Sequence, residues 1–119
     1  MAKVLLVDDE PDERFLLRRA FERAGHEVRD ASDGAEALRV VREFGPDLVV
    51  TDLMMPVMDG AELIRRLRAE PVTAAVLVLV SSFHSELAEG ADATVHKTGQ
   101  FRDVLEAAET LLDCGGRPC

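Results

Sequence analysis

Short apolar runs alternate along the chain with longer stretches in which apolar residues recur every three or four positions. The short runs are rich in Val, Leu and Ala and have few polar interruptions, which is typical of parallel strands that are buried on both faces. We predict strands at residues 3–7, 27–30, 47–51, 75–80 and 93–97, of which the second and the last have the weakest patterns.

The stretches between these strands carry helix signals. Apolar residues from Leu17 to Ala24 share one helical face, and the most regular helical pattern covers residues 101–112. Asp33 and Asp59 are each followed three residues later by a glutamate, which is the pattern of a capping box. Alternating strands and helices predict an α/β domain with a doubly wound parallel sheet and right-handed crossovers.

Length and charge narrow the class of protein. A chain of 119 residues with 47% apolar residues is expected to form one globular domain. Its 23 acidic and 14 basic residues give a formal net charge of −9, which argues against direct binding to nucleic acid or to an anionic membrane surface.

Cellular location is predicted from the apolar runs and the cysteines. No run approaches the roughly 20 residues of a membrane span, and the first one is too short for a secretion signal. We interpret Cys114 and Cys119 as incidental free thiols. A cytoplasmic protein is therefore expected.

Polar residues that can do chemistry follow four of the predicted strands. Asp8 and Asp9 end the first strand, Asp52 the third, Ser81 the fourth and Lys97 the fifth. In open α/β sheets the functional site lies at the carboxyl ends of the strands. Three carboxylates, a hydroxyl and an ammonium group are therefore expected at one edge of the sheet.

Such a cluster suits phosphoryl transfer. Close carboxylates repel one another, and a bound Mg²⁺, which prefers oxygen ligands, removes that repulsion. A carboxylate can also attack phosphorus, and phosphoryl transfer needs mainly positioning and neutralisation of charge. Taken singly, each residue has an ordinary interpretation: an acidic helix N-terminus, an exposed strand end, a turn serine or a surface lysine. Phosphoryl transfer is indicated because these residues all fall at the ends of predicted strands and are expected at one edge of the sheet.

Two motifs add a resemblance. The opening run at residues 4–10 and the run at residues 47–60, which contains Asp52, then Met55-Pro56, then Asp59-Gly60, look like the signatures of a known family. The sequence resembles the receiver domain of bacterial two-component response regulators over essentially its whole length. The resemblance implies a flavodoxin-like, five-stranded parallel sheet in the order 2-1-3-4-5, with a receiver domain at residues 1–113 and a tail or linker stub at residues 114–119.

The resemblance also implies site roles. Asp52 is the expected phosphoacceptor and a Mg²⁺ ligand. Asp9 is expected to bind Mg²⁺ directly and Asp8 through water, and the backbone carbonyl of Met54 is the remaining expected protein ligand.

Lys97 is expected to pair with the phosphoryl group, and Ser81 to be the switch hydroxyl. The implied donor is a sensor histidine kinase or a phosphotransfer protein. The protein is expected to be no enzyme, but a phosphoacceptor that assists its own phosphorylation and dephosphorylation. The downstream partner stays open, and a homodimer is one option.

The sequence departs from the family after the fourth strand. Thr98 follows Lys97 where the family has proline, so we predict a trans bond there. Thr94 occupies the position of the family's switch aromatic, and residues 82–93 leave room for only a shortened fourth helix. These departures favour the alternative, a receiver-fold interaction module with degenerate switching.

One enzyme class and one carrier class of similar topology fit this sequence less well than the receiver domain. A haloacid-dehalogenase-like phosphatase needs an aspartate at the position of Met54, and a flavodoxin needs a Ser/Thr-rich loop after the first strand, where this chain has acidic residues.

Overall fold

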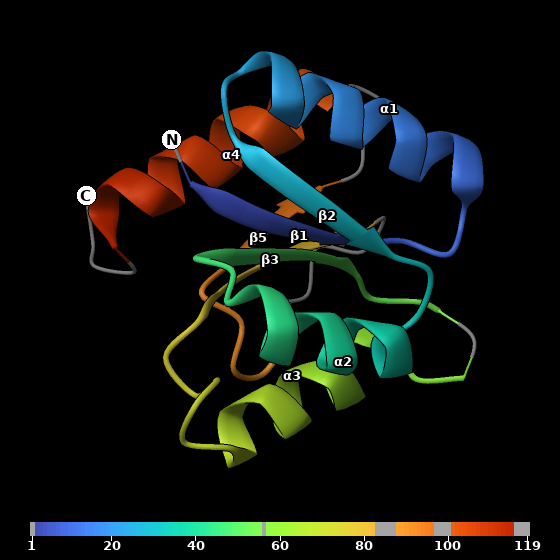
Figure 1. Ribbon diagram of the computed structural model, residues 1–119, viewed down its shortest axis with the longest axis vertical. Helices are drawn as coiled ribbons and strands as arrows, with labels where there is room; N and C mark the ends of the chain where they lie inside the picture. The colour runs from blue at the N-terminus through green and yellow to red at the C-terminus, as the bar shows by residue number, and fades with distance from the viewer. Residues whose placement is uncertain (1, 56, 83–87, 97–100, 116–119) are drawn as a thin grey trace.

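A five-stranded parallel sheet in the order β2-β1-β3-β4-β5 forms the middle layer of the chain (Figure 1). The computed structural model describes residues 2–55, 57–82, 88–96 and 101–115. The strands are β1 (Lys3–Val7), β2 (Glu27–Ala31), β3 (Leu48–Asp52), β4 (Leu77–Ser82) and β5 (Ala93–His96). The helices are α1 (Pro11–Arg23), α2 (Gly34–Phe44), α3 (Gly60–Ala69) and α4 (Phe101–Cys114).

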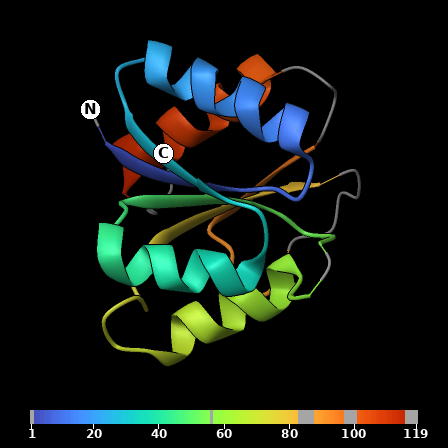
Figure 2. The ribbon, with the colours of Figure 1, turned by 45° about the vertical axis from the view of Figure 1, so that its right-hand side comes forward.

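Helices cover both faces of this sheet. Figures 1 and 2 show α1 and α4 on one face and α2 and α3 on the other. Because side chains alternate along a strand, Val4 and Leu6 of β1 pack in the core under α1 and α4, whereas Leu5 and Val7 pack in the core under α2 and α3. The predicted fold class and strand order are therefore confirmed.

The strands differ from their predicted positions by small amounts. β4 begins at Leu77, two residues later than expected, because pairing with β3 starts where Leu48 faces Leu77. β3 extends to Asp52, so the predicted phosphoacceptor is the last residue of its strand.

The two predicted acidic helix caps are present. Asp33 accepts a hydrogen bond from the Glu36 backbone N–H at 2.9 Å, and Asp59 accepts one from the Glu62 backbone N–H at 2.9 Å. In a full capping box the Glu36 carboxylate would accept from the backbone N–H of Asp33. Here it accepts instead from the backbone N–H and the hydroxyl of Ser32, at 3.1 and 2.7 Å. These bonds lower the pKa of Glu36, because they favour its ionised form.

The connection between β4 and β5 contains no helix within its described part, residues 88–92. Residues 83–87, where a shortened fourth helix was expected, lie outside the described residues. The Arg68 guanidinium of α3 donates hydrogen bonds to Gly90 O at 2.8 Å and to Asp92 Oδ2 at 2.9 Å. Asp92 Oδ2 also accepts from the Val78 backbone N–H at 2.8 Å, so this segment is held by α3 and β4.

The predicted free thiol at Cys114 is wrong, since this residue is disulfide-bonded. The sequence contained no second cysteine pair, but a disulfide needs only two cysteines that can approach each other. Among the helices in the described part of the chain, none is both long and apolar enough to cross a membrane.

Candidate functional site: an acidic cluster at the carboxyl edge of the sheet

The central strands of the sheet bring the predicted site residues to one edge. Asp8 directly follows β1, and Asp52 ends β3, the neighbour of β1 in the sheet. Ser81 of β4 is paired in register with Asp52. Lys97 and Thr98 lie outside the described residues. The pairing of Lys97 with a phosphoryl group and the trans peptide bond between Lys97 and Thr98 therefore stay predictions.

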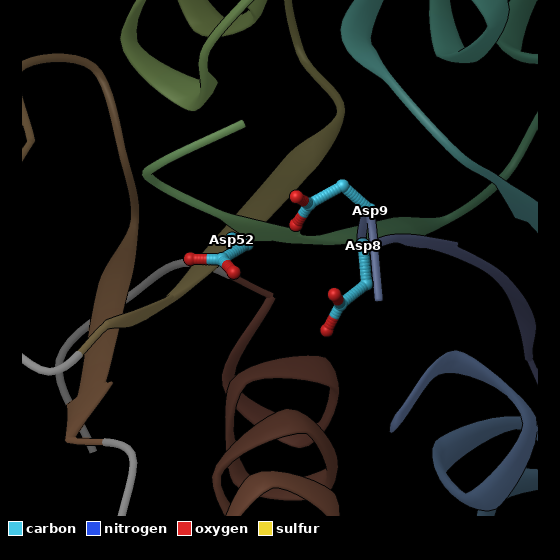
Figure 3. A group of neighbouring side chains, drawn as sticks. All are labelled: Asp8, Asp9 and Asp52. Atoms are coloured by element: carbon cyan, nitrogen blue, oxygen red, sulfur yellow. The ribbon is translucent and has the colours of Figure 1, made fainter. Parts of the chain in front are cut away.

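Three carboxyl groups border a common space at this edge (Figure 3). One oxygen from each of Asp8, Asp9 and Asp52 lies within 4.8 Å of the others. Asp8 is buried with 3% of its surface exposed, Asp52 is half-buried and Asp9 is exposed. The cluster thus has an inner, an intermediate and an outer carboxylate, a graded arrangement that remains open to solvent on one side.

Backbone and side-chain contacts fix the inner carboxylate. Asp8 Oδ1 accepts from the Glu10 backbone N–H at 2.9 Å, and Asp8 N–H donates to Ala31 O at 3.1 Å. Arg14 of α1 donates to the Asp8 backbone carbonyl at 2.7 Å and lies 3.8 Å from Asp30. The role of Arg14 has no signal in the sequence, because any residue can supply the backbone carbonyl that accepts its hydrogen bond.

The loop after β3 closes tightly against Asp52. Gly60 N–H donates to Leu53 O at 2.9 Å, and a Cβ placed on Gly60 would lie 2.5 Å from Asp52 O. Only glycine fits at this distance, which explains physically why Gly60 stands in the motif. The Met54 backbone N–H points back to Asp52 Oδ1 at 3.4 Å. Val57 adopts a φ of 68°, a strained value for a β-branched residue.

Two buried hydroxyl groups have no hydrogen-bond partner among the described residues. They are Ser81 Oγ, beside Asp52, and Thr94 Oγ1 on β5. A buried polar atom without a partner costs free energy, about 1–3 kcal/mol. Ser81 therefore offers a hydroxyl that a ligand oxygen at the acidic cluster could satisfy. Thr94 holds a small polar side chain where the family pattern has an aromatic ring.

The donor set fits a hard divalent cation. Carboxylate oxygens are preferred ligands of Mg²⁺, which keeps several waters and needs only one or two carboxylates with a phosphate oxygen. Asp8, Asp9 and Asp52 supply such oxygens around one space, and no His or Cys joins this cluster within the described ranges. The chemistry of the set thus agrees with the predicted Mg²⁺ site.

Comparison with known proteins assigns the family. The model of the response regulator receiver domain matches residues 4–109, so the chain belongs to this family of two-component signalling proteins. It is 42% identical over 115 residues to the alkaline phosphatase synthesis transcriptional regulatory protein PhoP of Bacillus subtilis, covering 92% of this chain and 48% of PhoP. The chain spans about half the length, or less, of the first curated relatives it matches.

Solved structures agree in fold. The chemotaxis response regulator CheY4 of Vibrio cholerae superposes with a TM-score of 0.86 at 28% identity, over 93% of this chain and 98% of CheY4. The response regulator TrrA of Thermotoga maritima, in complex with Mg²⁺-BeF, gives a TM-score of 0.83 at 30% identity, over 93% of this chain and 99% of TrrA.

Proposed function

We propose that this receiver domain is a phosphoacceptor switch in which Asp52 takes a phosphoryl group with the help of Mg²⁺. The observation that carries the proposal is the cluster of Asp8, Asp9 and Asp52, with one oxygen of each within 4.8 Å of the others. Family membership supports it, as does the solved relative TrrA, whose structure is a complex with Mg²⁺-BeF.

The proposed role of each residue in binding Mg²⁺ follows from its position in the cluster. Asp9 is exposed and would bind the cation directly, Asp8 is buried and would bind it through water, and Asp52 and the Met54 carbonyl would complete the protein ligands. When bound, Mg²⁺ supplies positive charge that offsets the negative charge on the phosphoryl oxygens.

The chemical step is a transfer between two nucleophiles. A carboxylate oxygen of Asp52 forms a bond to phosphorus while the bond from phosphorus to the donor's histidine nitrogen breaks, and that nitrogen keeps the electron pair. The Ser81 hydroxyl, buried and without a partner among the described residues, donates a hydrogen bond to a phosphoryl oxygen. Lys97 pairs with the same group. This charge and hydrogen-bond change biases the surface that a partner contacts.

The proposed donor is a sensor histidine kinase or a phosphotransfer protein, and the proposed location of this receiver domain is the cytoplasm. In this scheme the protein is not an enzyme toward other substrates, since the group that is transferred ends on its own aspartate. The chain promotes only its own phosphorylation and dephosphorylation.

Labelling by a small phosphodonor tests the proposal. Incubation with acetyl phosphate and Mg²⁺ is expected to add one phosphoryl group, seen by intact-protein mass spectrometry. The gain should vanish in Asp52→Asn and persist in the matched control Asp113→Asn, whose aspartate is exposed on α4. Labelling that persists in Asp52→Asn would show that Asp52 is not the acceptor.

The alternative, an interaction module with degenerate switching, is favoured by Thr94 and by the short sequence interval at residues 82–93, which leaves room for only a shortened fourth helix. Amide NMR spectra with and without beryllofluoride and Mg²⁺ separate the two functions. A switch predicts shifts that extend to Thr94 and β5, whereas an inert module predicts shifts confined to the acidic cluster.

A further inference from the structure

Arg14 of α1 contacts the backbone between two of the three aspartates in the acidic cluster. Its Nη1 donates a hydrogen bond to the Asp8 backbone carbonyl at 2.7 Å. This carbonyl belongs to the peptide group that joins Asp8 to Asp9, and a peptide group is planar. Figure 3 shows that the Asp8 and Asp9 side chains leave the chain in opposite directions and turn toward Asp52. The orientation of the peptide plane that Arg14 holds therefore affects the direction of both carboxyl groups.

This peptide group lies just beyond the paired part of β1. The last residue of β1 that pairs with the neighbouring strands is Val7. The backbone N–H of Asp8 still donates to Ala31 O at 3.1 Å, and the carboxylate of Asp8 accepts from the Glu10 backbone N–H at 2.9 Å. Both of these partners are backbone groups, whereas the Asp8 carbonyl is held by a side chain. A substitution at Arg14 can therefore remove this contact and leave the other two in place.

The Arg14 guanidinium is itself oriented by the sheet and by its own helix. Its Nε lies 3.8 Å from Asp30 Oδ1 on β2, and the side chain is 21% exposed. The backbone N–H of Arg14 donates to Glu10 O at 2.9 Å, so the residue belongs to the first turn of α1. One planar group thus reaches the Asp8 carbonyl and the Asp30 carboxylate together, which the single ammonium of a lysine does less well.

We propose that Arg14 is a positioning residue of the Mg²⁺ site, because it holds the peptide group between Asp8 and Asp9 so that both carboxylates face the space they share with Asp52. The inference rests on the proposed function, since it concerns the cation that assists phosphorylation of Asp52. Charge and position predict opposite effects at Arg14. Its positive charge repels a dication, so the loss of charge alone would strengthen Mg²⁺ binding. The loss of the hydrogen bond weakens Mg²⁺ binding, because the ligands are no longer held in place.

The dissociation constant for Mg²⁺ tests this proposal by the sign of its change. It is measured on the unphosphorylated chain from the amide NMR shifts of Asp9 and Asp52, at constant ionic strength. Arg14→Met removes the charge and the donor but keeps a long side chain, and we expect Mg²⁺ to bind about tenfold more weakly, the lower end of the range typical for partners of metal ligands. Arg18→Met is the matched control, since it removes the same charge from the same helix.

The control separates the position of Arg14 from its charge. Arg18 is 40% exposed and pairs with Asp30 and Glu22, so its loss should change the Mg²⁺ dissociation constant by less than about twofold. Urea unfolding of both variants measures stability separately. A merely structural role of Arg14 predicts a lower urea midpoint with an unchanged dissociation constant, and that result would overturn the proposal. Tighter binding in Arg14→Met, or an equal change in Arg18→Met, would overturn it too.

A second variant keeps the charge at this position. Arg14→Lys retains one donor but not the planar fork, and we expect Mg²⁺ to bind about threefold more weakly than in the wild type. Wild-type affinity in Arg14→Lys would also overturn the proposal, whether or not Arg14→Met folds. A wild-type protein whose amides do not respond to Mg²⁺ would instead refute the proposed Mg²⁺-assisted function, and this inference with it. A wild-type response that both Arg14 variants leave unchanged would refute the role of Arg14 alone.

Discussion

The guanidinium of Arg68 connects the two loops that precede β4 and β5. Its Nη1 donates to Ala74 O at 2.8 Å and to Val76 O at 2.6 Å, ahead of β4. Its Nε and Nη2 donate to Gly90 O at 3.1 and 2.8 Å, and Nη2 also donates to Asp92 Oδ2 at 2.9 Å, ahead of β5. We expect Arg68→Ala to destabilise the domain strongly while leaving the acidic cluster intact, since these loops lie at the opposite ends of the strands.

The size of the expected destabilisation follows from the hydrogen bonds that Arg68 makes and from the exposed fraction of its side chain. A hydrogen bond to a charged group contributes about 1.5–3 kcal/mol, but the bonds of one side chain do not add. The Arg68 side chain is 25% exposed, so water can reach some of the carbonyl groups it leaves, and Asp92 keeps its bond to the Val78 N–H. We therefore expect a loss of about 3 kcal/mol in the free energy of unfolding.

Urea unfolding followed by circular dichroism measures this loss, because the chain has no Trp or Tyr for intrinsic fluorescence. Arg66→Ala is the matched control on the same helix: Arg66 is 56% exposed and pairs only with Glu62 among the ion pairs seen in the described residues. This control should cost no more than about 0.5 kcal/mol. A loss in Arg68→Ala no larger than that in Arg66→Ala would refute the argument that Arg68 holds this connection.

Three further substitutions give expected outcomes. Gly60→Ala should reduce phosphorylation by acetyl phosphate and lower the urea midpoint, since its Cβ would lie 2.5 Å from Asp52 O; unchanged labelling would contradict this. Val57→Asn should raise the free energy of unfolding by about 1 kcal/mol, because asparagine tolerates positive φ better than valine; no gain in the urea midpoint would argue against strain there. Glu36→Gln should be less stable than the wild type at pH 7. The folded-state pKa of Glu36 is lowered, so its charge stabilises the wild type above the ordinary pKa of 4.5, and this stabilisation is lost as the pH falls. The difference in urea midpoint between the wild type and Glu36→Gln should therefore disappear at low pH. A difference that stays constant with pH would contradict the role of the Glu36 charge.

Sequence reasoning could place Asp8, Asp52 and Ser81 together, because apolar runs locate the strands and parallel strands end at a common edge. It could not find Arg14 or Arg68, whose acceptors are mostly backbone carbonyl groups that any residue can provide. Their geometry depends on how helices pack on the sheet, which the local pattern does not encode. The same limit explains the error at Cys114, whose bonding depends on a three-dimensional approach of two thiols.

The most direct test of the central claim is a titration of the wild-type protein with Mg²⁺, followed by amide NMR. If the three carboxylates share a cation site, the amides of Asp9, Asp52 and Met54 should shift and saturate together, and the shifts should be lost in Asp9→Asn. Amides that do not respond to Mg²⁺, or a response that is unchanged in Asp9→Asn, would contradict the account.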